Sequence, residues 1–192
     1  CCPSRASLLT GKYSHTVGFG HMDSDKGTKY PGYVGHLTGR TIAEYLKDSG
    51  YYTFITGKWH LGSKVKEHWP TSKGFDDFYG VPQGGGFYFD PGNMYSPRQV
   101  VRGTEVVYDK EKTPPKGWYA TDSFTDEGVK YVDKAVENQK PFFWYVAYNA
   151  PHFPLQAKQE DIKKYRGKYK NNWDDFRKKR FNKQVEMGIM RA

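Results

Sequence analysis

The chain has 192 residues, enough for one domain or for part of a larger one. Apolar residues and glycine together make up about 47% of it, inside the usual globular range, which argues against wholesale disorder. No apolar run approaches the roughly 20 residues that a membrane span needs. Two adjacent cysteines, Cys1 and Cys2, exclude a disulfide-rich scaffold.

The positive charge is concentrated near the C-terminus. Lys and Arg total 30 against 21 Asp and Glu, which gives a formal net charge of +9. Residues 158–183 contain 11 basic and 4 acidic residues, so the remainder of the chain is nearly neutral. The basic excess is a local feature and says little about the function of the rest.

A short helix is predicted at the start of the chain. Pro3 suits the first helical turn, where its missing N–H costs nothing, and Gly11 is a typical helix end. Cys1 then lies at the helix N-terminus, where free N–H groups and the helix dipole favour an anion. Arg5 follows one turn later, so its side chain can hold a group attached at position 1.

The middle of the chain is predicted to be mostly irregular. Residues 13–40 contain six glycines and indicate a loop. Residues 41–49 carry apolar side chains on one helical face, and residues 51–56 are β-branched and aromatic, which predicts a strand. Residues 62–120 are rich in glycine, proline and aromatics, with one strand pair expected near residues 99–108.

The second half repeats the order of helix and strand. A helix is predicted over residues 121–138 and a buried strand over residues 142–147. Apolar positions from 173 to 189 predict a basic amphipathic helix that packs on the sheet. Two successions of helix and strand indicate an α/β fold, a mostly parallel sheet with helices on both faces.

Residues that can carry chemistry follow both predicted strands. Lys58 and His60 are two residues apart, so they project to one side of an extended segment, and His152 lies in a stiff proline-flanked loop. Ligands of such sheets bind beyond the C-terminal strand ends, an edge that Cys1 and Arg5 also face. Singly, Lys58 would be a solvated charge and the histidines structural; together they favour a site for a sulfate or phosphate ester.

These residues stand in blocks that resemble the formylglycine-dependent sulfatases, in the family's order. The blocks are CCPSR and LTGK at residues 1–5 and 9–12, GKWHLG at 57–62, and APHFPL at 150–155. The resemblance runs from residue 1 to about 190. It implies an alkaline-phosphatase-like fold, present as an incomplete segment: residues 1–192 form a partial catalytic domain that lacks the N-terminal start and the C-terminal part.

The resemblance also implies hydrolysis of a sulfuric ester. Cys1 is oxidised to formylglycine by a maturation enzyme that reads Pro3, Ser4 and Arg5. One hydroxyl of the hydrated aldehyde attacks sulfur and displaces the alcohol, and loss of a proton from the other then expels sulfate. A divalent cation, Ca²⁺ or else Mg²⁺, held against the formylglycine at Cys1, stabilises the developing charge.

Roles for individual residues follow from the same resemblance. Arg5 orients the diol, Lys58 binds sulfate, and His60 helps to deprotonate the second hydroxyl. His152 protonates the leaving group, and Lys12 adds positive field near the diol.

The family's other metal ligands lie outside this stretch of sequence. Of them only position 1 is present, and the acidic pairs at residues 76–77 and 174–175 are not assigned to metal. The isolated segment is therefore expected to bind metal poorly and to turn over weakly or not at all.

Sulfated carbohydrate is the preferred substrate class, with aryl sulfate beside it. The aromatic loop over residues 83–89 either lines a sugar subsite or packs in the core, and His15 touches the substrate or lies free at the surface. Cys2 is interpreted as a passenger at a variable motif position. No nucleic acid partner and no membrane span are expected, and similar bacterial enzymes suggest a periplasmic or secreted protein.

Three alternatives stay open. A phosphatase or phosphodiesterase of the same superfamily usually carries Ser or Thr as the nucleophile, and Cys1 argues against it. A non-enzymatic nucleic-acid-binding module would use residues 158–183, for which a solvated helix face is the simpler interpretation. A pseudo-enzyme would keep the signature and lack the metal ligands.

Overall fold

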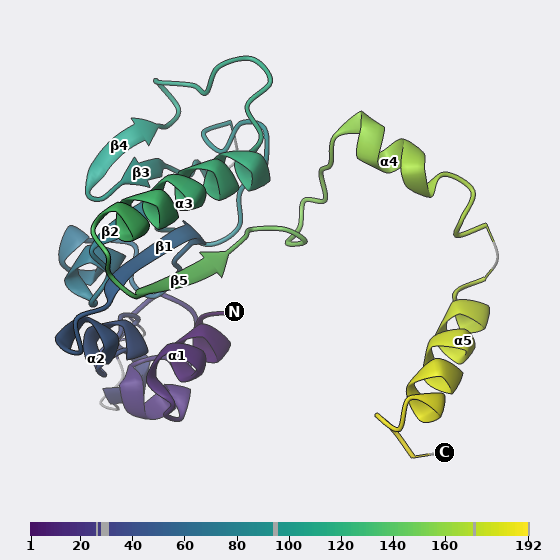
Figure 1. Ribbon diagram of the computed structural model, residues 1–192, viewed down its shortest axis with the longest axis horizontal. Coiled ribbons are helices and arrows are strands. Elements are labelled where there is room, and N and C mark those ends of the chain that lie inside the picture. Colours follow the sequence, from purple (N-terminus) through teal and green to yellow (C-terminus); the bar gives the residue numbers. More distant parts are fainter. Residues whose placement is uncertain (26, 28–30, 94–95, 171, 192) are drawn as a thin grey trace. The chain divides into compact units, whose positions relative to one another are not determined.

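A five-stranded sheet, with strands in the order β4-β3-β2-β1-β5, organises the first of two compact units, residues 1–155 (Figure 1). The computed structural model describes residues 1–192 except 26, 28–30, 94–95, 171 and 192. The strands are β1 Tyr52–Lys58, β2 Asp77–Val81, β3 Val100–Arg102, β4 Glu105–Tyr108 and β5 Phe142–Ala147. The helices of this unit are α1 Cys2–Thr10, α2 Ile42–Asp48 and α3 Ala120–Glu137, with 3-10 turns η1 Ser14–Val17, η2 Pro31–Tyr33, η3 Lys66–His68 and η4 Pro70–Ser72.

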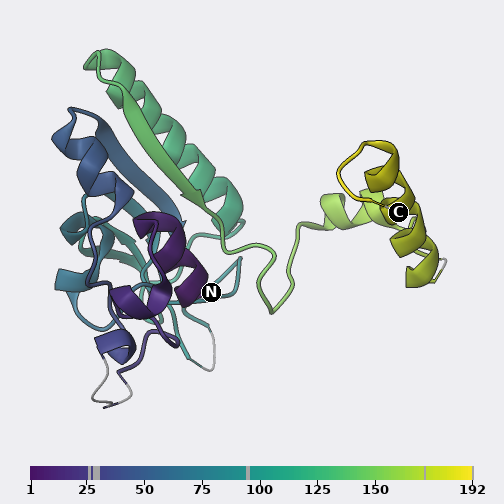
Figure 2. The same ribbon diagram turned by 90° about the horizontal axis from the view of Figure 1, so that it is seen from below.

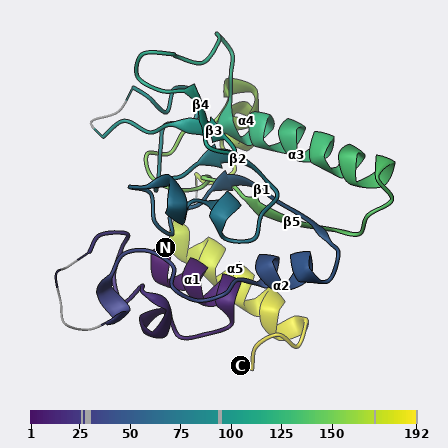
Figure 3. The same ribbon diagram turned by 90° about the vertical axis from the view of Figure 1, so that its left-hand side faces the viewer.

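The sheet is mostly parallel, as the order of elements predicts. β1 pairs in parallel with both β2 and β5, and the hairpin of β3 and β4 extends the sheet in antiparallel fashion beyond β2. Helix α3 covers one face, and α1 and α2 cover the other; Figures 2 and 3 show the two layers from different sides. The predicted α/β class with helices on both faces is confirmed.

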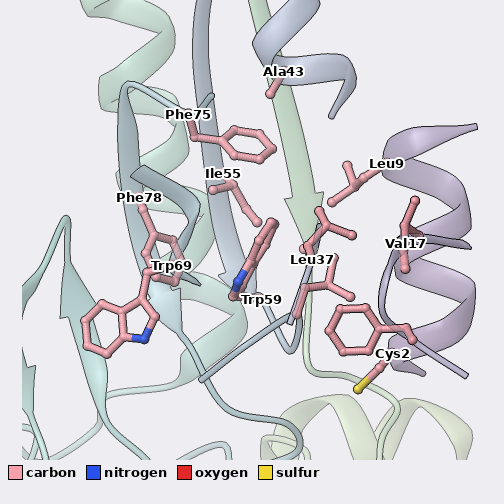
Figure 4. Packing of buried hydrophobic residues seen from close by; sticks show 14 of the residues in the cluster. Cys2, Leu9, Val17, Leu37, Ala43, Ile55, Trp59, Trp69, Phe75 and Phe78 are labelled. Carbon is pink, nitrogen blue, oxygen red and sulfur yellow. The ribbon is translucent and has the colours of Figure 1, made fainter. Parts of the chain in front are cut away.

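Each face of the sheet carries its own apolar core. Neighbouring residues of a strand point to opposite faces, so Ile55 packs toward α1 and α2 while Phe54 packs toward α3. Figure 4 shows the first core, where Trp59 and Leu37 lie between α1 and the strands. Trp59 is completely buried directly beyond the end of β1. This packing fixes the position of the residues on either side of it.

The helix boundaries follow local capping chemistry. Helix α1 has Cys1 as its N-cap and ends at Gly11, whose left-handed φ of 66° suits glycine. Helix α2 begins with a capping box, in which Thr41 Oγ1 accepts from Glu44 N at 3.1 Å and Glu44 Oε2 accepts from Thr41 N at 2.8 Å. Both helices therefore begin and end within about one residue of their predicted limits.

Two features of the sheet differ from the prediction. The middle strand, β2, is not predicted, because Asp77 and Gly80 are poor strand formers in a glycine-rich context. A Cβ at Gly80 would lie 1.9 Å from Gly57 O, so the close approach of β2 to β1 requires glycine there. The strand at 142–147 is predicted to be buried, yet it is the edge strand β5, with Phe142 and Val146 about two fifths exposed.

Residues 156–192 form the second unit. It contains helices α4 Gln159–Tyr165 and α5 Trp173–Glu186, none of whose described residues is buried. Tyr169 contacts the rings of Trp173 and Phe176. The basic helix is confirmed, whereas its packing on the sheet stays a prediction. No described helix is long and apolar enough to cross a membrane.

We expect Gly128→Ala to destabilise the protein by about 1–3 kcal/mol through overpacking, although alanine is the better helix former. A Cβ at position 128 of α3 would lie 1.9 Å from Trp144 Cζ2. Trp144 cannot easily move, because its Nε1 donates to Thr56 Oγ1 at 2.9 Å. Urea unfolding measures the loss, with Val129→Ala on the exposed side of α3 as the control. An unchanged unfolding midpoint in Gly128→Ala would contradict this packing.

Candidate functional site

The ends of β1 and β2 carry the chain side by side into the candidate site. Beyond the strands, Trp59 N donates to Val81 O and His60 N donates to Pro82 O, both at 2.9 Å. β5 ends beside β1 and leads to His152. The segments after three neighbouring parallel strands therefore meet at one edge of the sheet.

Cys1, Arg5 and Lys58 come together at the N-terminus of α1. Lys58 Nζ lies 3.1 Å from Cys1 Sγ, and Cys1 itself is exposed. Arg5 Nη1 donates to the carbonyl of Lys58 at 2.7 Å and to the hydroxyl of Tyr145 at 3.2 Å. Arg5 therefore joins the start of α1 to the ends of β1 and β5.

Burial makes the two cations of this group strong anion ligands. Lys58 is 3% exposed, and burial together with the nearby Arg5 guanidinium lowers the pKa of Lys58 to about 8. Burial also lowers the pKa of Arg5 below its usual range. Cations that have lost much of their water gain more from an anionic partner than exposed ones do.

His60 lies beside Asp23. Its Nε2 is 3.4 Å from Asp23 Oδ1, and Ser63 Oγ donates to Asp23 Oδ2 at 2.6 Å. The contact with His60 lowers the pKa of Asp23 to about 2, while burial lowers the pKa of His60 below its usual value. Asp23 is therefore ionised and His60 neutral at pH 7, the state that a proton acceptor needs.

The backbone and one ring nitrogen of His60 are unusual. Its φ is 61°, a left-handed conformation that is uncommon outside glycine. Gly84 covers the ring, since a Cβ there would lie 2.1 Å from His60 Cε1. His60 Nδ1 is buried and has no hydrogen-bond partner among the described residues. A buried polar atom of this kind is expected where a ligand or a reacting group binds.

His152 lies against the next residue of the same glycine segment. A Cβ at Gly85 would be 3.3 Å from His152 Cε1, and Asn149 Nδ2 donates to Gly85 O at 2.8 Å. The His152 side chain is exposed. Because Gly84 contacts His60, the two histidines are brought to the same rim from different strands.

The aromatic loop at 83–89 is divided between core and surface. Tyr88 is 2% exposed and donates its hydroxyl to His152 O at 2.5 Å, so it supports the histidine loop from below. Phe89 is 39% exposed, and its ring centroid lies 4.9 Å from that of Tyr119. Core packing therefore holds for Tyr88, and a sugar subsite at Phe89 stays a prediction.

Lys12 and His15 have no described contact with the Cys1–Lys58 pair. Lys12 follows the C-terminal end of α1, so the nine-residue helix separates it from Cys1 by roughly 14 Å. His15 lies in η1 with its ring edge against Tyr33, at a centroid distance of 5.8 Å. Their roles at the site stay predictions.

Four polar residues of the site are not predicted from the sequence. They are Asp23, Ser63, Arg98 and Asn149. Ser63 directly follows GKWHLG and Asn149 directly precedes APHFPL, which is the one indication that the sequence offers. Asp23 and Arg98 stand in irregular segments, where no periodicity relates them to the strand ends.

One group of described residues has the composition of a metal site. Cys2, Asp23 and His60 place a sulfur, an oxygen and a nitrogen within 4.8 Å of one another. Ca²⁺ takes about six to eight oxygen ligands, so this set with its single carboxylate does not fit calcium. The pair Asp76 and Asp77 forms ion pairs with lysines at the other end of the strands, in agreement with leaving it unassigned.

Cys2 is not a passenger in structural terms. It is completely buried in the core beside α1, in the lower part of Figure 4. Burial, followed by the negative charge of Asp23, raises the pKa of Cys2 to about 11. Both cysteines are free thiols, and adjacent residues fit the geometry of a disulfide badly.

The comparison with known proteins gives one family. The family model described as Sulfatase matches residues 1–187. An uncharacterised sulfatase of Schizosaccharomyces pombe is 34% identical over 206 residues, covering 99% of this chain and 36% of that protein. An arylsulfatase of Klebsiella aerogenes is 34% identical over 196 residues, covering 98% and 41%. The chain thus spans about two fifths of the length of these relatives.

A solved structure shares the fold. The crystal structure of Ps i-CgsB in complex with k-i-k-neocarrahexaose superposes with a TM-score of 0.71 at 33% sequence identity. The match covers 91% of this chain and 39% of that one. The likeness in fold therefore extends over most of this chain.

We expect the two thiols to differ in reactivity when position 1 is still cysteine. Iodoacetamide should alkylate Cys1 at least about tenfold faster than Cys2, because thiolates react and burial suppresses the thiolate of Cys2. Peptide mass spectrometry over a time course measures both rates, and the urea-unfolded protein is the control in which the difference disappears. Equal rates in the folded protein would contradict the burial of Cys2.

Proposed function

The chain belongs to the sulfatase family, and from that membership we propose that the protein hydrolyses sulfate esters at the edge of the sheet described above. The observation that carries the proposal is the 3.1 Å contact between Lys58 Nζ and Cys1 Sγ at the N-terminus of α1. The family nucleophile position is thereby paired with a buried cation. A sulfate ester needs both, a nucleophile for sulfur and a cation for its oxygens.

Position 1 fits the formylglycine that the family generally uses. The Cys1 Sγ stands where an oxygen of the oxidised residue would be, within reach of the Lys58 ammonium. When formed, the hydrated aldehyde supplies two hydroxyls, one to attack sulfur and one whose deprotonation releases sulfate.

Arg5 and Lys58 have complementary roles in this proposal. Lys58 binds the sulfate oxygens and holds the nucleophile through the same ammonium group. Arg5 keeps Lys58 in place through its 2.7 Å bond to the Lys58 carbonyl, and it adds positive charge behind the nucleophile. Preorganised cations of this kind stabilise the charge that develops on the transferred group.

His60 is proposed as the proton acceptor at position 1. It is neutral, buried and oriented by Asp23, and its Nδ1 has no described partner to displace. The negative charge of Asp23 stabilises the imidazolium that forms when His60 accepts a proton. Asp23 therefore acts through His60, in the way that a carboxylate orients a catalytic imidazole elsewhere.

His152 is proposed to donate a proton to the departing alcohol. The exposed ring lies against Gly85, next to the Gly84 that covers His60, and in this proposal the alcohol part of a substrate extends past it toward solvent. Two histidines with different burial then divide the proton transfers between them, one for the nucleophile and one for the leaving group.

A metal ion belongs to the chemistry of the family, but the described residues offer it no oxygen-rich site. Calcium, which suits sulfate and carboxylate oxygens, would therefore need ligands beyond this set. The steps proposed for this chain are therefore carried out by its own side chains.

Sulfated carbohydrate is the substrate class that we propose. The ligand named for the similar structure is an oligosaccharide, k-i-k-neocarrahexaose. In this chain, Phe89 directly follows Tyr88, which donates to His152 O, and its exposed ring offers an apolar surface on which a sugar ring can stack. Aryl sulfates present a similar flat apolar group, which makes them suitable probes.

Mass spectrometry of position 1 tests the proposal directly. In the full-length protein purified from its native host, the peptide that contains residue 1 should carry formylglycine, which lacks sulfur and is lighter than cysteine. That protein should hydrolyse 4-nitrophenyl sulfate faster than 4-nitrophenyl phosphate, and Cys1→Ala should abolish the sulfatase reaction. An active enzyme with an unmodified thiol, or a preference for phosphate, would refute the proposal.

We expect Lys58→Ala and His152→Ala to lower the turnover of sulfate esters by roughly 10²–10⁴-fold, the range for lost proton transfer or charge stabilisation. Lys64→Ala and His21→Ala are matched controls at exposed positions of neighbouring loops. Steady-state kinetics give the turnover, and thermal unfolding shows whether each variant is folded. Full activity in a folded Lys58 or His152 variant would remove the role of that residue.

A further inference from the structure

Arg98 is a cation at the rim of the site that the proposed reaction does not use. Its Nε donates to Gly84 O at 2.6 Å, and its Nη1 donates to Ser96 O and Oγ, each at 2.7 Å. All these acceptors are neutral. In the part of the chain that the structure describes, no carboxylate forms an ion pair with Arg98, and no hydrogen bond is formed by its Nη2.

The glycine segment 84–86 fixes Arg98 relative to the histidines. Gly84 covers His60, and Gly85 contacts His152. A Cβ at the next residue, Gly86, would lie 3.7 Å from Arg98 Cγ and 3.2 Å from Asn149 Nδ2. The two histidines and Arg98 therefore each lie against one of three consecutive glycines.

The charge of the site is larger than one sulfate ester requires. Arg5, Lys58 and Arg98 supply three positive charges against the one carboxylate of Asp23. The positive charge of Arg98 contributes to the lowered pKa of Lys58, and Arg98 also interacts electrostatically with Asp23. Burial is the main cause of the lowered pKa of Arg98 itself. A sulfate monoester carries a single negative charge, so these residues leave one positive charge without a partner.

A half-buried guanidinium without a carboxylate is costly unless a ligand completes it. Its planar fork suits oxyanions such as carboxylate and sulfate, which accept two parallel hydrogen bonds. The neutral acceptors fix the directions of Nε and Nη1. Because the guanidinium group is planar and rigid, they thereby also fix the position of Nη2.

We propose that Arg98 forms a subsite for a second anionic group, a sulfate or a carboxylate, carried by the sugar whose sulfate ester is cleaved. The inference rests on the proposed sulfatase function and narrows its substrates to multiply charged glycans. Arg98 is a binding residue in this account and takes no part in proton transfer.

The test compares inhibitors that differ by one charge. Two disaccharides of the same backbone, one monosulfated and one disulfated, compete with 4-nitrophenyl sulfate for the full-length protein, and a uronate-containing monosulfated disaccharide is the third probe. In the wild type, the second anionic group should lower the inhibition constant by about tenfold or more, as expected for a hydrogen bond between charged groups. The more effective of the two additions distinguishes sulfate from carboxylate.

The ratio of inhibition constants is the decisive readout. Arg98→Gln should bring the ratio for the two sulfated disaccharides close to one, and Arg98→Lys should restore part of it. Arg40→Gln, at an exposed arginine of another loop, should leave the ratio as in the wild type. A general disturbance of the Gly84 segment would weaken all inhibitors alike and keep the ratio, and that outcome would overturn the subsite.

The failure of the two proposals can be told apart. If the wild type hydrolyses 4-nitrophenyl sulfate but does not distinguish the mono- from the disulfated disaccharide, the subsite is wrong and the sulfatase function stands. If the wild type hydrolyses no sulfate ester, the proposed function is wrong and the subsite is wrong with it.

Discussion

The hydrogen bond from Arg5 to the carbonyl of Lys58 is the interaction on which the site depends. It ties the first turn of α1 to the last residue of β1, two elements that are 53 residues apart in sequence. Without this bond, α1 would be held against the sheet only by the apolar packing of Ala6 and Leu9. Such packing sets the distance between helix and sheet, but not the position of the helix along the strands. A side chain that is itself a cation thus performs the alignment, so the same bond that aligns Cys1 with Lys58 also places a positive charge beside them.

Glycine makes the second half of the site possible. His60, His152 and Arg98 come from three separate segments, and each of them lies against one of the three glycines at 84–86. Any side chain at position 84 would collide with the His60 ring, so the close approach requires glycine for reasons of space. The unusual left-handed backbone of His60 lies directly after the fully buried Trp59. Packing of an apolar residue thereby holds a strained polar one in place.

Much of this arrangement could be predicted from the sequence, because it follows from local rules. Strand ends at Lys58 and Ala147 are marked by β-branched and aromatic runs, and parallel strands bring whatever follows them to one edge. The middle strand β2 could not be predicted in this way, because position 80 requires glycine for reasons of space, and glycine has a low strand propensity. A Cβ there would lie 1.9 Å from Gly57 O. Asp23 and Arg98 could not be predicted as site residues for a related reason. Their positions are set by contacts with residues 37 and 14 positions away, and neither periodicity nor a motif encodes such contacts.

The distribution of charge shows why the net value says so little about function. Most of the +9 lies in residues 158–183, where no described residue is buried and water screens the charge. The candidate site holds four charged residues, namely Arg5, Lys58, Arg98 and Asp23. Together they contribute only +2 to the net charge of the chain. They are decisive because burial removes the solvent that would compensate them, as the lowered pKa values of Lys58 and Arg98 indicate. A small local excess, held by neutral hydrogen-bond acceptors and by glycine backbone, selects an anionic ligand more strongly than a larger excess spread over an exposed helix.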